Sequence, residues 1–159
     1  MREQNDISHK EAVERLKQFG ITNEKMYLIN LILLVEMMWA DGQAQKGERE
    51  ILEKYLEKHI DNVNNQVGCE VLQVQDARDF VKPYIDKRPD AKTIKSLREL
   101  VKPISFPVPS NMNEKLKDEL LHVCMDMGAI STTEYPYPHD ERFSKEEKQC
   151  FFKILQALS

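Results

Sequence analysis

The chain has few of the residues that mark β-sheets, disulfide frameworks and membrane spans. Only five glycines occur among 159 residues, and Val and Thr rarely cluster, which argues against a β-rich fold. The three cysteines are odd in number and far apart, a pattern that favours reduced, mostly buried thiols over disulfides or a zinc knuckle. The longest apolar stretch, residues 26–40, is interrupted by Asn30 and Glu36 and is too short to cross a bilayer. Because the beginning of the chain has no hydrophobic signal segment, we expect a cytoplasmic protein without a membrane span.

The motifs of common enzymes and nucleic-acid-binding proteins are also missing. Because there is no glycine-rich phosphate loop, activated nucleophile or HExxH zinc-protease motif, we expect no enzymatic activity. A net charge of −4 provides no general attraction to nucleic acid or to anionic membranes. The exception is local: segment 82–102 holds seven Lys or Arg against three Asp or Glu, and Lys95, Arg98 and Lys102 share a helical face. This basic face and the loop 128–143 are the two surfaces on which a protein partner could dock.

Helical periodicity runs along most of the chain. Hydrophobic residues make up 41% and charged residues 31% of the sequence, which is typical of a helical globule. Residues 28–35 are apolar in nearly every direction, which predicts a central, fully buried helix. We therefore predict one all-α domain over 1–159, with about seven helices in two pseudo-symmetric halves around that helix. The first half spans about 8–102, an extended connector covers 103–111, and the second half spans about 112–159.

Particular residues predict where single helices begin, bend and end. Asp90 is a predicted N-cap, and Pro103 is predicted to end the helix that Asp90 begins. The polar run 61–65 is predicted to break the chain after a helix at about 47–59. Pro83 predicts a kink or a break in the helical segment that contains it.

The most informative pattern is a repeated pair of acidic residues. Asp41 follows a strongly apolar helix, and Glu48 stands at the head of an amphipathic one. Ninety-nine residues later, Asp140 and Glu147 take the same places. The apolar positions that follow also match: Ile51, Leu52, Tyr55 and Leu56 in the first unit, and Cys150, Phe151, Ile154 and Leu155 in the second. Two such helix–loop–helix units indicate an internal duplication.

The four carboxylates are candidate ligands of one shared cation site. If the halves pack around a pseudo-twofold axis, Asp41, Glu48, Asp140 and Glu147 converge, and their charges repel unless a proton, a basic side chain or a cation compensates them. Oxygen ligands favour Ca²⁺, Mg²⁺ or Mn²⁺, and an acid at Asp41 opposes the dipole of the preceding helix. The structural alternative is that the acids only cap and pack, since Glu147 can form a capping box with Ser144.

The first acidic unit resembles a known family. Ala40-Asp41-Gly42, followed by Glu48 and Ile51, looks like the signature of the TerB-like proteins, all-helical domains associated with tellurite resistance. The resemblance implies an all-α fold of two similar halves, an acidic cluster thought to bind metal and no established catalytic activity. It also points to a role in a bacterial stress response.

The second unit departs from the family pattern. Asp140 is followed by Glu141 rather than glycine, and a rival register puts Met127 and Glu134 at the two acidic positions. We favour Asp140 and Glu147 because an apolar-periodic helix follows them, whereas Tyr-Pro-Tyr-Pro follows Glu134 and cannot continue a helix. We therefore expect a non-enzymatic TerB-like module that binds a hard cation. The alternative is a helical interaction scaffold whose acidic residues are purely structural.

Overall fold

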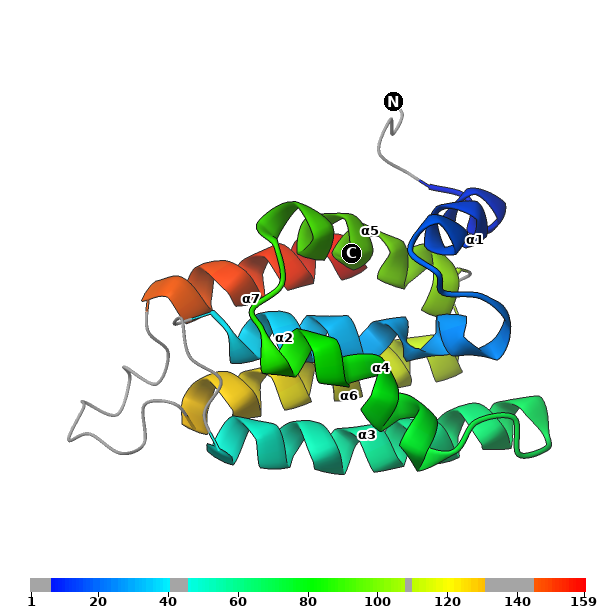
Figure 1. Cartoon of the computed structure of the whole chain (residues 1–159), viewed down its shortest axis with the longest axis horizontal. Helices are drawn as coiled ribbons and strands as arrows, with labels where there is room; N and C mark the ends of the chain where they lie inside the picture. The colour runs from blue at the N-terminus through cyan, green and yellow to red at the C-terminus, as the bar shows by residue number, and fades with distance from the viewer. Residues whose placement is uncertain (1–6, 41–45, 108–109, 131–144) are drawn as a thin grey trace.

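Seven α-helices and one 3-10 helix make up the described parts of the chain (Figure 1). The structure, a computed structural model, describes residues 7–40, 46–107, 110–130 and 145–159. The elements are α1 (His9–Gln18), η1 (Asn23–Asn30), α2 (Leu31–Met38), α3 (Lys46–Val67), α4 (Val74–Asp86), α5 (Ala91–Ser105), α6 (Asn111–Ile130) and α7 (Lys145–Leu158). These residues contain no strand, and none of their helices is both long and apolar enough to cross a membrane. The predicted all-α class is confirmed.

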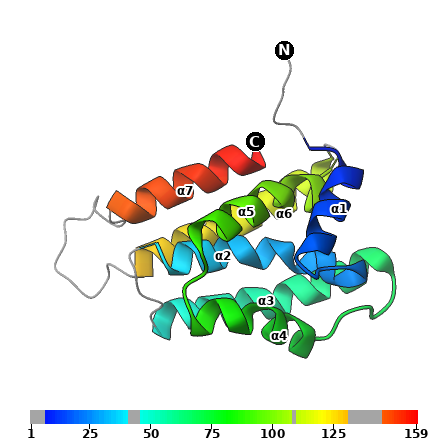
Figure 2. The same cartoon turned by 45° about the horizontal axis from the view of Figure 1, so that its top comes forward.

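Helix α2 lies at the centre of the molecule. Its fully buried residues are Leu31, Ile32, Leu33, Leu34, Val35, Met37 and Met38, each 0% exposed. It contacts α3, α4 and α5 as well as α6 and α7, and Figures 1 and 2 show it between α7 and α3. The prediction of a central helix that is buried from all sides is therefore confirmed. Helices of both predicted halves pack on it.

The predicted break in the polar run 61–65 was wrong, because α3 continues to Val67. Asn64 shows what one of these polar residues does within the helix, because its side chain bonds to the backbone of the segment that follows α3. Its side-chain amide nitrogen donates to the carbonyl oxygen of Leu72 at 2.9 Å, and its oxygen accepts from the backbone N–H groups of Val71 and Leu72 at 2.9 and 3.1 Å. The polar side chain thus holds the segment that leads into α4, rather than ending α3.

The two prolines also lie within helices. α5 begins at the predicted N-cap, where the carboxylate of Asp90 accepts from the backbone N–H groups of Lys92 and Thr93. It continues past Pro103 to Ser105, so the predicted end at Pro103 was wrong. Pro103 falls in the last turn, where the backbone N–H of Phe106 donates a 2.8 Å hydrogen bond to the carbonyl oxygen of Lys102. Pro83 likewise lies inside α4, and the connector between α5 and α6 is shorter than the predicted 103–111.

A histidine is buried where α3 passes η1. His59 is 7% exposed, its ring stacks on Tyr55 with centroids 5.6 Å apart, and its Nε2 donates to the carbonyl oxygen of Tyr27 at 2.6 Å. Burial lowers the pKa of His59 from its ordinary value of 6.5, because the charged ring loses its hydration, and the Tyr27 hydrogen bond opposes this only in part. The folded protein therefore favours a neutral His59.

Truncation of the central helix tests the core. Leu33→Ala and Leu34→Ala each remove a side chain that is 0% exposed, so the more costly of the two should lower the free energy of unfolding by about 2–5 kcal/mol. Leu155→Ala is the control, since Leu155 is 36% exposed, and it should cost less than about 1 kcal/mol. Chemical denaturation measures all three variants. If both core truncations cost less than about 1 kcal/mol, α2 is not the centre of the core.

The neutral His59 predicts a pH dependence of stability. The unfolded chain takes up a proton on this ring near pH 6.5, whereas the folded protein does so only at lower pH, so stability should fall as pH decreases below about 6.5. His59→Gln keeps a donor but does not titrate, and it should lose less stability than wild type between pH 7 and 5.5. His122→Gln, at an exposed position, should keep the wild-type slope. Equal slopes for wild type and His59→Gln in denaturation experiments would contradict this account.

Candidate functional site

Two of the four predicted cation ligands lie in the described residues. Glu48 is in the first turn of α3 and Glu147 is in the first turn of α7, as the sequence predicts. Asp41 and Asp140 lie outside the described residues, as does most of the loop 128–143. The described part of the candidate site is therefore a pair of glutamates on two helices.

The two glutamate-bearing helices begin at the same end of the molecule, which we call the acidic end. Figures 1 and 2 show the starts of α3 and α7 there, together with the last turns of α2 and α6. α2 contacts α6 and α7, and α6 contacts both α3 and α7. Helix ends from both predicted halves thus gather in one region, which is the arrangement that a shared site requires.

Both glutamates are buried. Glu48 and Glu147 are each 0% exposed, whereas Glu50 and Glu146, which lie close by on the same two helices, are exposed. A carboxylate in the first turn of a helix is stabilised by the helix dipole even at the surface, so this preference does not by itself explain burial. Charged glutamates are almost never fully buried without compensating interactions. Burial of both singles them out among the acidic residues of the two helices.

Two buried cysteines lie near the acidic end. Cys150 follows Glu147 by one helical turn, and burial raises its pKa far above the ordinary value of 9.0. Burial raises the pKa of Cys124 in the same way, with the charges of Cys150 and Glu36 adding to the effect. Both sulfurs therefore stay protonated thiols at neutral pH and are not activated nucleophiles. The prediction of buried free thiols is confirmed for these two, while Cys69 is exposed.

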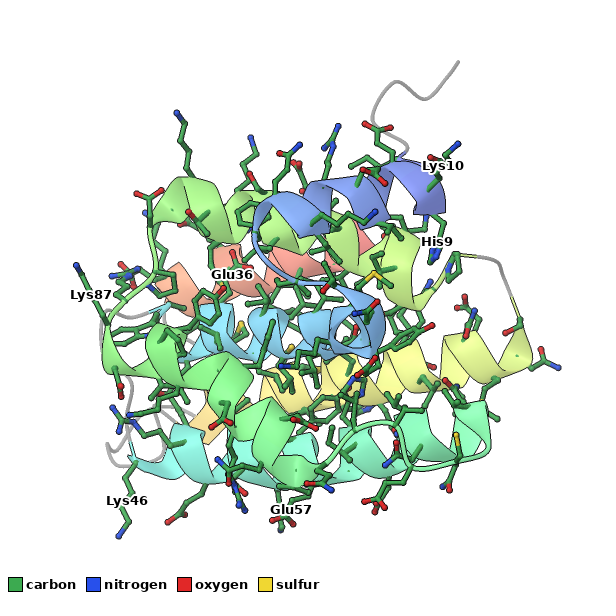
Figure 3. All side chains as sticks on the ribbon, turned by 45° about the vertical axis from the view of Figure 1, so that its right-hand side comes forward. His9, Lys10, Glu36, Lys46, Glu57 and Lys87 are labelled. Carbon is green, nitrogen blue, oxygen red and sulfur yellow. The ribbon has the colours of Figure 1, made fainter. Side chains whose placement is uncertain are left out.

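A buried ion pair joins α2 to α5, and the sequence analysis missed it. Arg98 of α5 donates from Nη1 to Oε2 of Glu36 (labelled in Figure 3), and the two side chains are 11% and 10% exposed. Burial raises the pKa of Glu36 above its ordinary value and outweighs the opposing effects of Arg98 and Lys153. The sequence signal for this pair is Glu36, the charged residue of an otherwise apolar helix. A buried acid of this kind requires a cation close by. Its partner lies 62 residues away and cannot be read from spacing.

The described residues do not complete a metal site by themselves. Across 7–40, 46–107, 110–130 and 145–159, no group of three His, Cys, Asp or Glu side chains is placed to hold a metal ion. A site at the acidic end therefore needs ligands besides Glu48 and Glu147. The predicted ones, Asp41 and Asp140, are the residues that follow α2 and precede α7 in the sequence.

Comparison of the chain with protein-family models, with curated proteins and with solved structures finds no match. The TerB-like resemblance therefore rests on the motif residues alone.

Removal of one member of the buried ion pair should be costly. Arg98→Met leaves the Glu36 carboxylate buried without its cation and should lower the free energy of unfolding by about 3–5 kcal/mol. The double variant Glu36→Leu/Arg98→Met leaves no charge behind and should be more stable than the Arg98→Met variant. Urea denaturation measures both. A single-variant cost below about 1 kcal/mol, or a double variant less stable than Arg98→Met, would contradict the importance of this pair.

Proposed function

We propose that the chain is a non-enzymatic, TerB-like cation-binding module. Glu48 and Glu147, together with Asp41 and Asp140, hold one hard divalent cation such as Ca²⁺, Mg²⁺ or Mn²⁺ at the acidic end. The observation that carries the proposal is the complete burial of two glutamates in the first turns of helices that begin at the same end of the molecule (Figures 1 and 2). A role in a bacterial stress or tellurite response belongs to the same proposal and is supported by the motif residues alone.

The chemistry of the two helix starts supports a hard cation. Carboxylates that gather in one region repel each other, and a divalent ion bound between them removes that repulsion. Thiolate ligands would favour softer ions, but Cys150, one helical turn after Glu147, is a protonated thiol whose pKa is raised by burial. Because the glutamates come from one helix of each predicted half, a bound ion would link α3 to α7. Its binding would then stabilise the fold as well as occupy the site.

The alternative is a helical interaction scaffold in which the acids are structural. Exposed large apolar side chains on the last two helices favour this function, since Met125 is 44% and Phe152 59% exposed. A partner would dock on the basic face of 82–102 or on the loop 128–143. This function requires no cation, and the experiment below separates it from the first.

Cation-dependent stability tests the proposal. An ion present at about a hundred times its dissociation constant adds about 2.7 kcal/mol to stability, which for a chain of this size raises the melting temperature by about 5–10 °C. We expect Ca²⁺, Mg²⁺ or Mn²⁺ to produce such a rise in metal-stripped wild type. Glu48→Gln/Glu147→Gln should abolish it, because Gln keeps the hydrogen-bonding shape but removes the charge.

The chain supplies a matched control on the same two helices. Glu50→Gln/Glu146→Gln removes the same charge from exposed positions, so it should keep the full cation-dependent rise. Asp41→Asn with Asp140→Asn tests the other two predicted ligands and should reduce the rise. If metal-stripped wild type shows no shift with any of the three ions, the acids are structural and the scaffold function replaces the proposed one.

A further inference from the structure

A second candidate site lies between α1, α5 and α7, where a cavity of about 780 Å³ opens on the surface. Figures 1 and 2 show α5 close to α1 at one end and running beside α7, and α5 contacts both helices. The cavity is lined by the second half of α7, not by its first turn, so it is separate from the acidic end. Its volume is in the range of small-molecule pockets.

Positive charge dominates the lining of this cavity. Its cationic residues come from three helices and are Arg15, Lys95, Arg98, Lys102 and Lys153, and the acid among the lining residues is Glu99. The whole chain carries a net charge of −4, so this concentration of cations is local. A concave surface with one sign of charge focuses the field and attracts ligands of the opposite sign.

Three of the five cationic side chains have interaction partners within the protein. Arg98 is held by Glu36 in the buried pair described above. Arg15 pairs with Glu11 at 2.6 Å, but both side chains are about half exposed, and exposed pairs of this kind contribute little. Lys102 donates to the backbone carbonyl oxygen of Ser159. With Glu11, Glu36 and Glu99 counted against the five cations, positive charge remains in excess.

Lys95 and Lys153 make no such direct contact, although the charge of Lys153 acts on Glu36 and opposes the rise in the pKa of that carboxyl. Within the described part of the chain, neither makes an ion pair or a side-chain hydrogen bond. The helix dipole favours cations in the last turn, which suits Lys102 but not these two, because Lys95 lies in the first half of α5 and Lys153 lies in the middle of α7. Two lysines that line one cavity from two different helices, and that make neither an ion pair nor a side-chain hydrogen bond with the described residues, are available to a ligand.

We propose that this cavity binds a small ligand that carries two or more phosphate groups. Lys95 and Lys153 contact the phosphates, and Arg15 and Lys102 contribute from the other walls. Lysine and arginine are the side chains that bind phosphate most strongly, and cations spread over three helices suit several anionic groups better than one. Apolar lining residues, Phe106 among them, provide a surface for the part of the ligand that bears no charge.

Titration of the whole chain with inorganic tripolyphosphate tests the proposal. Calorimetry is done in metal-free buffer, so that the result is independent of any cation at the acidic end. We expect saturable binding by wild type and an affinity lowered by about tenfold or more in Lys95→Gln/Lys153→Gln, which loses two charge-assisted contacts. The matched control is Lys92→Gln/Lys54→Gln, two exposed lysines outside the cavity on α5 and α3. It should bind within about twofold of wild type, and melting curves verify that both double variants are folded.

A second arm identifies the source of the phosphates. Vesicles that contain a phosphatidylinositol bisphosphate, compared with vesicles of phosphatidylcholine alone, show whether a lipid head group is bound. Loss of vesicle binding in Lys95→Gln/Lys153→Gln but not in the control assigns a lipid source, and binding of tripolyphosphate alone assigns a soluble one. Either result supports the cavity as a phosphate site. Absence of binding in both arms, equal loss in the two double variants, or equal affinity for citrate would overturn it.

Discussion

The arrangement of the other helices depends on the burial of α2 from every side. This helix has eight residues, too few to be stable by itself in water, so its structure comes from tertiary packing. Its apolar surface leaves no side for solvent, and α3, α4, α5, α6 and α7 all contact it. Because helices from both predicted halves pack on the same core, the first turns of α3 and α7 are held at the same end of the molecule.

One arginine connects this core to the surface cavity. Glu36 is the charged residue of α2, and its burial in an apolar centre requires a cation close by. Arg98 supplies the cation from α5, and the same residue lines the cavity between α1, α5 and α7. The ion pair therefore acts together with the buried apolar residues of α5 to set which side of α5 faces the core. Lys95 lies three residues before Arg98 and Lys102 lies four residues after it, so the three side chains share one face of α5 and line the same cavity.

Local patterns predicted the helices well and their interactions poorly. The apolar run of α2 and the N-cap at Asp90 depend on neighbouring residues, and both predictions are confirmed. The polar run 61–65 and Pro103 were misread, because Asn64 bonds to residues seven and eight positions later and because Pro103 falls in a last turn that tolerates it. The first-turn positions of Glu48 and Glu147 could be predicted, but their burial could not. Burial and the Glu36–Arg98 pair depend on residues brought together only by the fold.

The proposed role of the two buried glutamates is to bind a cation. Calorimetric titration of metal-stripped protein with Ca²⁺, Mg²⁺ and Mn²⁺ tests it most directly, because it counts ions per chain as well as measuring affinity. If the glutamates bind a cation, at least one of these ions occupies one saturable site per chain, and this site is absent in Glu48→Gln/Glu147→Gln and retained in Glu50→Gln/Glu146→Gln. Heats no larger than those of dilution for all three ions in wild type would contradict it, as would an unchanged isotherm in the Glu48→Gln/Glu147→Gln variant.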